Sequence, residues 1–218
     1  RLVARAVARY LKWEGRRDLS VYQARPHGTY PAPFRPAQQG LVVGYDTRFL
    51  SARFARAVAD EVAALGIPVL LSDEVAPTPA VSQAVRDHQA AGAIIVTASH
   101  NPSEYNGLKF KPEYASSGLP EIMDAILPFV RDEQEHPSPH ATSPASVRMF
   151  SPVAGYRAEM EALVDLERIR RSGLEVVVDP MHGAGVGIVR SLLGGEGARA
   201  IVREIRGTAD PTFGGFNP

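Results

Sequence analysis

Several side chains capable of chemistry are concentrated in residues 97–109. Ser99 offers a hydroxyl, His100 an imidazole, Asn101 an amide and Lys109 an ammonium group. A serine hydroxyl is a weak nucleophile unless a base activates it or it already carries a phosphoryl group. The lysine would attract phosphate oxygens, and with a lowered pKa it would also exchange a proton with a hydroxyl. The segment is therefore a candidate reactive loop, although Ser, His and Asn are also common turn-formers that make only local hydrogen bonds.

The position of this loop favours the reactive interpretation. It follows the apolar run 93–96, which predicts a short buried strand. Pro102 forces a turn, and Gly107 lets the backbone fold back so that Lys109 can return toward Ser99. Open α/β sheets bind their ligands in the crevice at the carboxyl ends of the strands. We therefore expect Ser99 to project into that crevice.

The string Thr-Ala-Ser-His-Asn-Pro-Ser-Glu-Tyr-Asn-Gly-Leu-Lys at 97–109 resembles the phosphoserine loop of the α-D-phosphohexomutases, the phosphoglucomutase/phosphomannomutase family. The resemblance implies that Ser99 carries a phosphoryl group, that Lys109 is a general acid/base, and that His100 is the histidine after the serine. Asp46 and Arg48 resemble the family's Asp-x-Arg turn near that serine. A capping aspartate followed by a surface arginine is the simpler alternative for this pair.

The resemblance also implies an activity, a cofactor and a substrate class. The family interconverts hexose 1-phosphate and hexose 6-phosphate, here glucose or mannose phosphate, through a hexose 1,6-bisphosphate. Its Mg²⁺ is held by three aspartates and the serine phosphate, and only the last ligand, on Ser99, is expected in this chain. The chain would then be an N-terminal fragment that is inactive alone. The alternative is a non-catalytic, stand-alone α/β binding module, and a serine hydrolase is disfavoured because the G-x-S-x-G motif is missing.

The pattern of elements predicts an α/β fold. Strands at 41–45, 67–71, 93–97 and 108–111 alternate with helices near 51–65, 77–88 and 119–131, and another helix spans 1–13. We expect Ser51 to cap the second helix and Phe54 to lie on its apolar face. Alternating strands and helices indicate a three-layer α/β/α domain with a mainly parallel sheet. This first domain covers 1–135 and includes a surface insertion at about 14–40.

A second unit follows a linker. Residues 136–150 are rich in Pro, Ser and His and predict an interdomain linker. Residues 151–218 predict the incomplete start of a second, similar α/β domain, with a helix at 153–171, a buried strand at 174–178 and a strand at 198–203. The glycines at 183, 185 and 187 lack the G-x-G-x-x-G spacing, so we reject dinucleotide binding.

The amino-acid composition further narrows the classes of protein to which the chain could belong. The 218 residues are 44% hydrophobic, which is enough for a core, and contain 24 basic and 24 acidic residues. That balance argues against a nucleic-acid binder. There is no cysteine and no apolar run long enough to span a membrane, so we expect a cytoplasmic protein without membrane contact. An Arg-rich amphipathic start can also be a transit peptide, but we favour a surface helix. The sequence decides neither the preferred hexose nor the oligomeric state.

Overall fold

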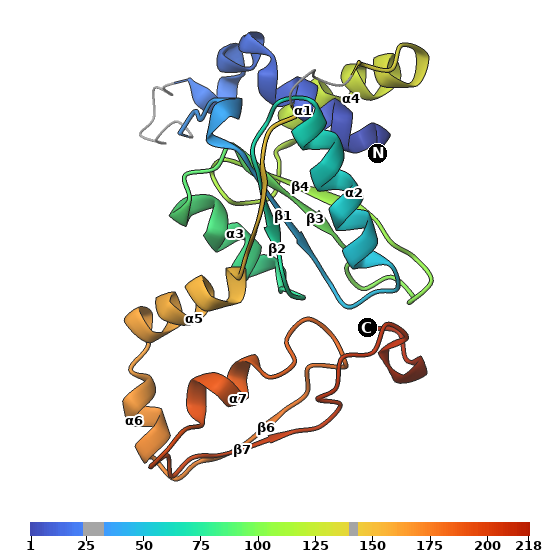
Figure 1. The fold of residues 1–218 in the computed structure, drawn as a ribbon. Helices are drawn as coiled ribbons and strands as arrows, with labels where there is room; N and C mark the ends of the chain where they lie inside the picture. The colour runs from blue at the N-terminus through green and yellow to red at the C-terminus, as the bar shows by residue number, and fades with distance from the viewer. Residues whose placement is uncertain (24–32, 140–143) are drawn as a thin grey trace.

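The computed structural model describes residues 1–23, 33–139 and 144–218, which form two α/β units (Figure 1). The first contains a five-stranded sheet with the order β4-β3-β1-β2-β5. Its strands are β1 (Leu41–Tyr45), β2 (Val69–Ser72), β3 (Gly92–Val96), β4 (Leu108–Pro112) and β5 (Val147–Phe150). All neighbours are parallel except β4, which is antiparallel to β3. The mainly parallel sheet predicted from the sequence is confirmed.

Helices cover both faces of this sheet. The helices α1 (Leu2–Lys12), α2 (Ser51–Ala64) and α4 (Pro120–Glu135) pack on one face, and α3 (Thr78–Asp87) packs on the other (Figure 1). Val43 and Ile94 point into the first core, whereas their neighbours Val42 and Ile95 point into the second. Burial on both faces explains why these strands are continuous apolar runs. The three-layer α/β/α architecture is confirmed.

Gly44 lets α3 pack closely against β1. A Cβ atom at this position would lie 2.4 Å from Val81 Cγ2 on α3, far inside van der Waals contact. A glycine inside a strand often marks such a close approach. Because Gly44 has no side chain, α3 can lie this close to the sheet.

The strand β5 lies inside the stretch that we expected to be a linker. Residues Val147–Phe150 pair in parallel with Val69–Ser72 and form one edge of the first sheet. The composition of the stretch, rich in Pro and Ser, gives no sign of this strand. Its four residues become a strand because they pair with the free edge of β2. The helix before it also continues to Glu135 rather than ending at 131. The linker interpretation of 147–150 is therefore wrong, while the domain boundaries themselves remain a prediction.

The described part of segment 14–40 is not a simple surface insertion. It forms the short 3₁₀ helices η1 (Glu14–Asp18), η2 (Ser20–Tyr22) and η3 (Ala37–Gln39). Arg16 is fully buried, with Nη1 3.7 Å from the Glu113 carboxylate and its guanidinium 4.5 Å from the Phe34 ring centroid. A buried ion pair anchors this segment to the domain, a contact that composition cannot indicate. The remainder of the expected insertion, 24–32, lies outside the described residues.

The second unit is smaller and more open. It contains α5 (Pro152–Leu163), α6 (Leu166–Arg171), β6 (Glu175–Val178), α7 (Ile188–Leu193), β7 (Ile201–Glu204) and η4 (Phe213–Gly215). The strands β6 and β7 form a two-stranded parallel sheet. The predicted helix at 153–171 is two helices, because Val164 is extended and Asp165 caps α6 by accepting a hydrogen bond from Arg168 N at 3.0 Å.

The strand β6 is also less buried than predicted. Its residues alternate between exposed and half-buried, and the Val177 side chain is 66% exposed. Among the described residues, helices lie on only one face of this small sheet (Figure 1). The strand is apolar, but Val177 lies on a face of the sheet that is exposed in this structure, and not in a buried core.

The helix α5 joins the two units. It packs against α3 of the first unit, and Val153 on α5 belongs to the same buried cluster as Val81 and Val85 on α3. Ile188 of α7 extends that cluster into the second unit. The second unit is thus attached by a shared apolar core on the α3 side of the sheet.

Candidate active site

The loop between β3 and β4 is closed at its base and holds Ser99 in a special conformation. Thr97 N donates to Gly107 O at 2.9 Å, which joins the two ends of the loop. Thr97 Oγ1 accepts a hydrogen bond from Ser99 N at 3.1 Å. Ser99 has φ of 59°, in the left-handed region. Such conformations cost about 1–3 kcal/mol and persist where the surroundings enforce them, often at functional sites.

Arg48 enforces this conformation from inside the loop. Its side chain is fully buried. Nη1 donates to the carbonyls of Pro102 and Tyr105 at 2.7 and 3.0 Å, and Nη2 donates to those of Ser99 and Asn101 at 2.9 and 2.7 Å. One guanidinium therefore holds four backbone carbonyls of the reactive loop. The alternative interpretation of Arg48 as a surface arginine is wrong.

Asp46 in turn orients Arg48. Asp46 Oδ1 accepts hydrogen bonds from Arg48 N at 3.0 Å and from Ser51 Oγ at 2.9 Å, and Oδ2 lies 3.2 Å from Arg48 Nε. Ser51 Oγ also accepts from Asn106 Nδ2 at 2.9 Å. Residues of the β1–α2 turn and of the reactive loop are thereby connected through a continuous hydrogen-bond network.

Sequence reasoning missed two members of this network. Ser51 was expected to cap α2, but Leu50 occupies the cap position and the Ser51 hydroxyl is used by Asp46. The sequence indicates Asn106 only as a member of the loop. The pattern that could have identified Ser51 is its distance of five residues from Asp46 across a tight turn. Phe54, expected on the buried face of α2, is 44% exposed.

The three residues predicted to react lie together. Ser99 and His100 are exposed, and Ser99 Oγ lies 3.4 Å from His100 Nδ1. Lys109 is half-buried on β4, directly opposite Ile95 of β3. All three line one cavity of about 390 Å³. Asp46 lines the same cavity, whereas Arg48 lies behind it and Asn101 contributes its backbone carbonyl to Arg48.

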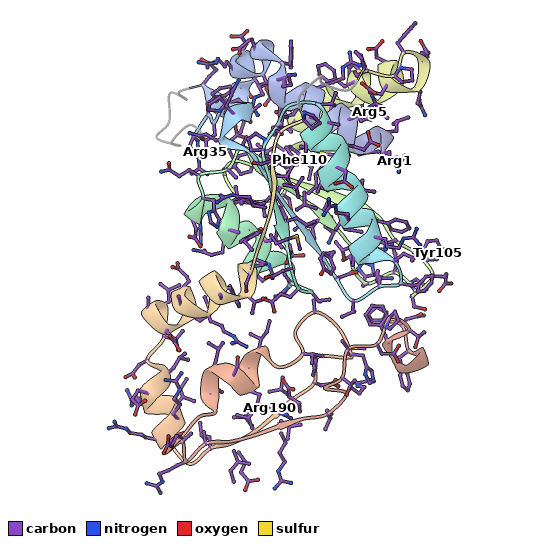
Figure 2. All side chains as sticks on the ribbon, viewed as in Figure 1. Arg1, Arg5, Arg35, Tyr105, Phe110 and Arg190 are labelled. Carbon is purple, nitrogen blue, oxygen red and sulfur yellow. The ribbon has the colours of Figure 1, made fainter. Side chains whose placement is uncertain are left out.

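Both units contribute to this cavity. The first unit supplies the reactive loop, Thr47 and the N-terminal end of α3, and the second supplies Gly183, Ala184, Phe213 and Pro218. The volume is within the range of about 300–1,000 Å³ that is typical of small-molecule sites. Figure 2 shows Tyr105, on the reactive loop, at the end of the first unit that faces the second. The site thus lies at the carboxyl ends of β1 and β3, as expected for an open α/β sheet.

A larger cavity lies elsewhere and is chemically poorer. It has a volume of about 580 Å³ and is lined mainly by apolar groups of α2 and the start of β4, with Arg1 and Arg53 as its charged members. It contains neither Ser99 nor Lys109. Convergence of several polar groups identifies a reactive site better than volume does. We therefore place the candidate site in the smaller cavity.

Lys111 is a second basic residue that sequence reasoning overlooked. It follows Lys109 by two residues on β4, so both side chains leave the same face of the strand. Burial, together with the positive charge of Lys109, holds the pKa of Lys111 below its ordinary value. Repetition of lysine with a period of two in a short strand was the available signal.

The described residues do not make a self-contained metal site. No group of three or more His, Cys, Asp or Glu side chains within 1–23, 33–139 and 144–218 is arranged to hold a metal ion. The cavity carboxylate, Asp46, is already bound by Arg48 and Ser51. Ser99 therefore remains the one predicted metal contact, through a phosphate.

Comparison with known proteins identifies the family. The family model "Phosphoglucomutase/phosphomannomutase, alpha/beta/alpha domain I" matches residues 27–137, and the corresponding domain II model matches 154–218. The chain therefore belongs to the phosphoglucomutase/phosphomannomutase family, as its sequence indicated. The first match begins inside segment 14–40.

Individual relatives agree with this assignment. A phosphoglucomutase of Staphylococcus epidermidis (strain ATCC 12228 / FDA PCI 1200) is 36% identical over 167 residues, which cover 70% of this chain and 29% of the relative. A crystal structure from Thermus thermophilus, described as a phosphomannomutase, superposes with a TM-score of 0.77 at 32% identity, covering 100% of this chain and 43% of that one. The chain thus spans less than a third of the curated relative's length.

A more distant structure shows the same fold. The open form of parafusin, a phosphoglucomutase from Paramecium, gives a TM-score of 0.71 at 19% identity and covers 100% of this chain and 41% of that one.

Within the described part of the chain, no helix is both long and apolar enough to cross a membrane.

Proposed function

We propose that this chain provides the phosphoserine part of a phosphohexomutase that interconverts hexose 1-phosphate and hexose 6-phosphate. One observation carries the proposal: Ser99, His100 and Lys109 line a single cavity in a chain of the phosphoglucomutase/phosphomannomutase family. The substrates are glucose or mannose phosphate, and the intermediate is a hexose 1,6-bisphosphate. Members of this family are generally metal-dependent.

The geometry supports the following steps of phosphoryl transfer between Ser99 and the sugar. A hexose hydroxyl attacks the phosphorus on phospho-Ser99, so that a phosphorus–oxygen bond to the sugar forms while the bond to Ser99 Oγ breaks. Lys109 is the group that accepts the proton of the attacking hydroxyl. His100 Nδ1, 3.4 Å from Ser99 Oγ, is positioned to return a proton to that oxygen. After the bisphosphate reorients in the site, the same steps in reverse transfer its other phosphoryl group to Ser99.

The rest of the site supports this chemistry by positioning and charge. Phosphoryl transfer depends chiefly on alignment and on neutralisation of the phosphate oxygens. Arg48 fixes the Ser99 backbone, and Lys109 contributes positive charge at the cavity wall once it has accepted the proton. We propose Mg²⁺ as the cofactor, held through the phosphate on Ser99, because hard oxygen ligands suit this ion. No group of three or more His, Cys, Asp or Glu side chains among the described residues is arranged to supply its other ligands.

Three finer proposals accompany this function. The chain spans less than a third of its curated relative, so we propose that full turnover needs the additional length which that protein has. We propose a cytoplasmic location and no nucleic-acid or membrane partner. The alternative of a non-catalytic binding module is not favoured, because a structural module needs no serine, histidine and lysine around one cavity.

The decisive experiment locates the phosphate. Purified protein is treated with hexose 1,6-bisphosphate and Mg²⁺, and phosphopeptide mass spectrometry maps the modified residue. We expect phosphate on Ser99, and its loss in Ser99→Ala. The matched control is Ser103→Ala, because Ser103 lies in the same loop but does not line the cavity. Phosphate on another residue, or equal labelling of Ser99→Ala and the wild type, would contradict the proposal.

A further inference from the structure

Phe213 stands out in the last segment of the second unit. The residues from Pro211 to Asn217 are exposed except for Phe213, which is only 5% exposed. Phe213 belongs to neither of the two buried apolar clusters described above. Instead it reaches across to the first unit and lines the cavity that contains Ser99. A single buried aromatic in an exposed segment is an anchor, and the partner of this anchor lies in the other unit.

That partner is Arg48. The guanidinium carbon of Arg48 lies 5.0 Å from the centroid of the Phe213 ring. This distance is within the limit of about 6 Å for a cation–π interaction, which is strongest when both groups are removed from water. The Arg48 side chain is fully buried, so this condition is met. The edges of the guanidinium are used by loop carbonyls, and the aromatic ring supplies a further contact to the same group.

The turn around Phe213 holds the ring in place. Phe213 has φ of 53°, which is uncommon for an aromatic residue. Asp210 Oδ1 accepts hydrogen bonds from Thr212 N and Thr212 Oγ1, both at 2.8 Å, and Oδ2 accepts from Gly214 N at 3.2 Å. These bonds support the strained residue from both sides. The segment is therefore built to present one aromatic ring to Arg48.

We infer that Phe213 is a positioning residue for Ser99, acting across the two units through Arg48. Arg48 Nη2 holds the carbonyl of Ser99 itself, so whatever restrains the guanidinium also restrains the serine backbone. The α5–α3 contact attaches the second unit at one side of the cavity, and Phe213 attaches it at the reactive loop. The geometry of the serine loop thus depends on the second unit being in place.

The test distinguishes a cation–π contact between Phe213 and Arg48 from simple apolar packing of the Phe213 side chain. Hydrogen exchange of the 218-residue chain is followed for the amides of 97–107 in wild type, Phe213→Leu and Phe213→Tyr. A parallel series replaces Phe213 by phenylalanines with one to three ring fluorines, which weaken the cation–π attraction at nearly constant size. We expect exchange in the loop to be at least about fivefold faster in Phe213→Leu, near wild type in Phe213→Tyr, and progressively faster with each fluorine.

Two controls complete the design. Amides of 41–45 and 92–96 should keep their wild-type protection in every variant, which shows that the first sheet remains folded. Phe216→Leu is the matched control, because Phe216 is 60% exposed on the same segment and should leave the loop unchanged. Wild-type loop exchange in Phe213→Leu, or an equal effect of all fluorinated variants, would overturn the inference.

The inference rests on the proposed function only for its catalytic consequence. If Ser99 carries the phosphoryl group, Phe213→Leu should lower the rate of Ser99 phosphorylation by hexose 1,6-bisphosphate, and Phe213→Tyr should restore it. If Ser99 is never phosphorylated while the exchange pattern is as expected, the proposed function fails and the positioning role stands. If the loop exchange does not respond, the positioning role fails whatever happens at Ser99.

Discussion

At the scale of single residues, the site separates the groups that we propose to react from the groups that hold them. Ser99, His100 and Lys109 lie at the cavity, while Arg48 lies behind the loop and binds its carbonyls. The first group was predicted because a serine, a histidine and a lysine lie within 97–109 and because that string resembles the family's phosphoserine loop. The resemblance predicted Arg48 near the serine, but not its burial or its hydrogen bonds to the loop carbonyls, since an arginine in a turn is usually exposed and its burial depends on the folded loop.

Lys109 gives the sharpest prediction at this scale. If it transfers a proton, Lys109→Arg should lower the rate of phosphoryl transfer at Ser99 by about 10²–10⁴-fold although the positive charge remains. Arginine stays protonated and presents a planar fork instead of a compact ammonium. The measurement is a single-turnover rate in the active protein, with Lys12→Arg as the control, because Lys12 does not line the cavity. A loss below about threefold would show that Lys109 is only a counter-charge.

At the scale of elements, the strands were easier to predict than their connections. The strands β1, β2 and β3 were expected within two residues of their observed bounds, because apolar runs between turn-formers are a strong signal. The strand β5 was missed, since four residues in a Pro- and Ser-rich stretch carry little signal of their own and depend on the free edge of β2. The break at Asp165 was missed although an aspartate before a short amphipathic run is a typical cap.

The contact between β1 and α3 provides a stability prediction. Gly44→Ala should destabilise the protein by about 1–3 kcal/mol, because the new methyl group would overlap Val81 Cγ2 and valine has little rotamer freedom. Val81→Ala should be destabilising alone, by about 1–3 kcal/mol, through the cavity it leaves. The double variant should be more stable than the sum of the two single effects predicts. Additive free energies from urea unfolding would contradict the close approach.

The pairing of α1 with α4 predicts a pH dependence. Burial disfavours ionisation of Glu133, but hydrogen bonds from Ser138 and Arg9 and the charge of Arg5 outweigh it and hold the pKa of Glu133 below its ordinary value. A carboxylate with a lowered folded-state pKa stabilises the protein above its unfolded-state pKa, near 4.5, and this stabilisation is lost as the pH falls through the folded-state pKa.

Glu133→Gln should therefore reduce the free energy of unfolding at pH 7 by about 1–3 kcal/mol, because Arg5 and Arg9 lose a buried partner. The difference from wild type should shrink as the pH falls below about 4.5, where the wild-type carboxyl also becomes neutral. Urea unfolding at several pH values measures this difference. Glu135→Gln, exposed on the same helix, is the control and should show no such pH dependence.

At the scale of the whole molecule, the two units differ in how completely they are covered. The first sheet is packed on both faces, whereas Val177, Ile201 and Ile205 on and beside the second sheet are 66, 46 and 51% exposed. The sequence predicted a second α/β unit with apolar strands, and the comparisons confirm the two-domain arrangement. It predicted a crevice at the carboxyl ends of the strands but not that the second unit lines it, because that depends on α5 packing against α3 and on Phe213 reaching Arg48.

This difference predicts unequal protection from hydrogen exchange. Local opening is easiest where few apolar contacts are buried. We therefore expect the amides of β6 and β7 to exchange faster than those of β1 and β3 by at least about tenfold in the 218-residue chain. The C-terminal turn at Phe213 should be slower than its exposed neighbours, since its ring is buried against Arg48. Mass spectrometry of deuterated peptic fragments measures both rates in one experiment. Equal protection across both units would show that the two-stranded sheet is as stable as the five-stranded one, and that the open apolar face of β6 and β7 costs the fold little.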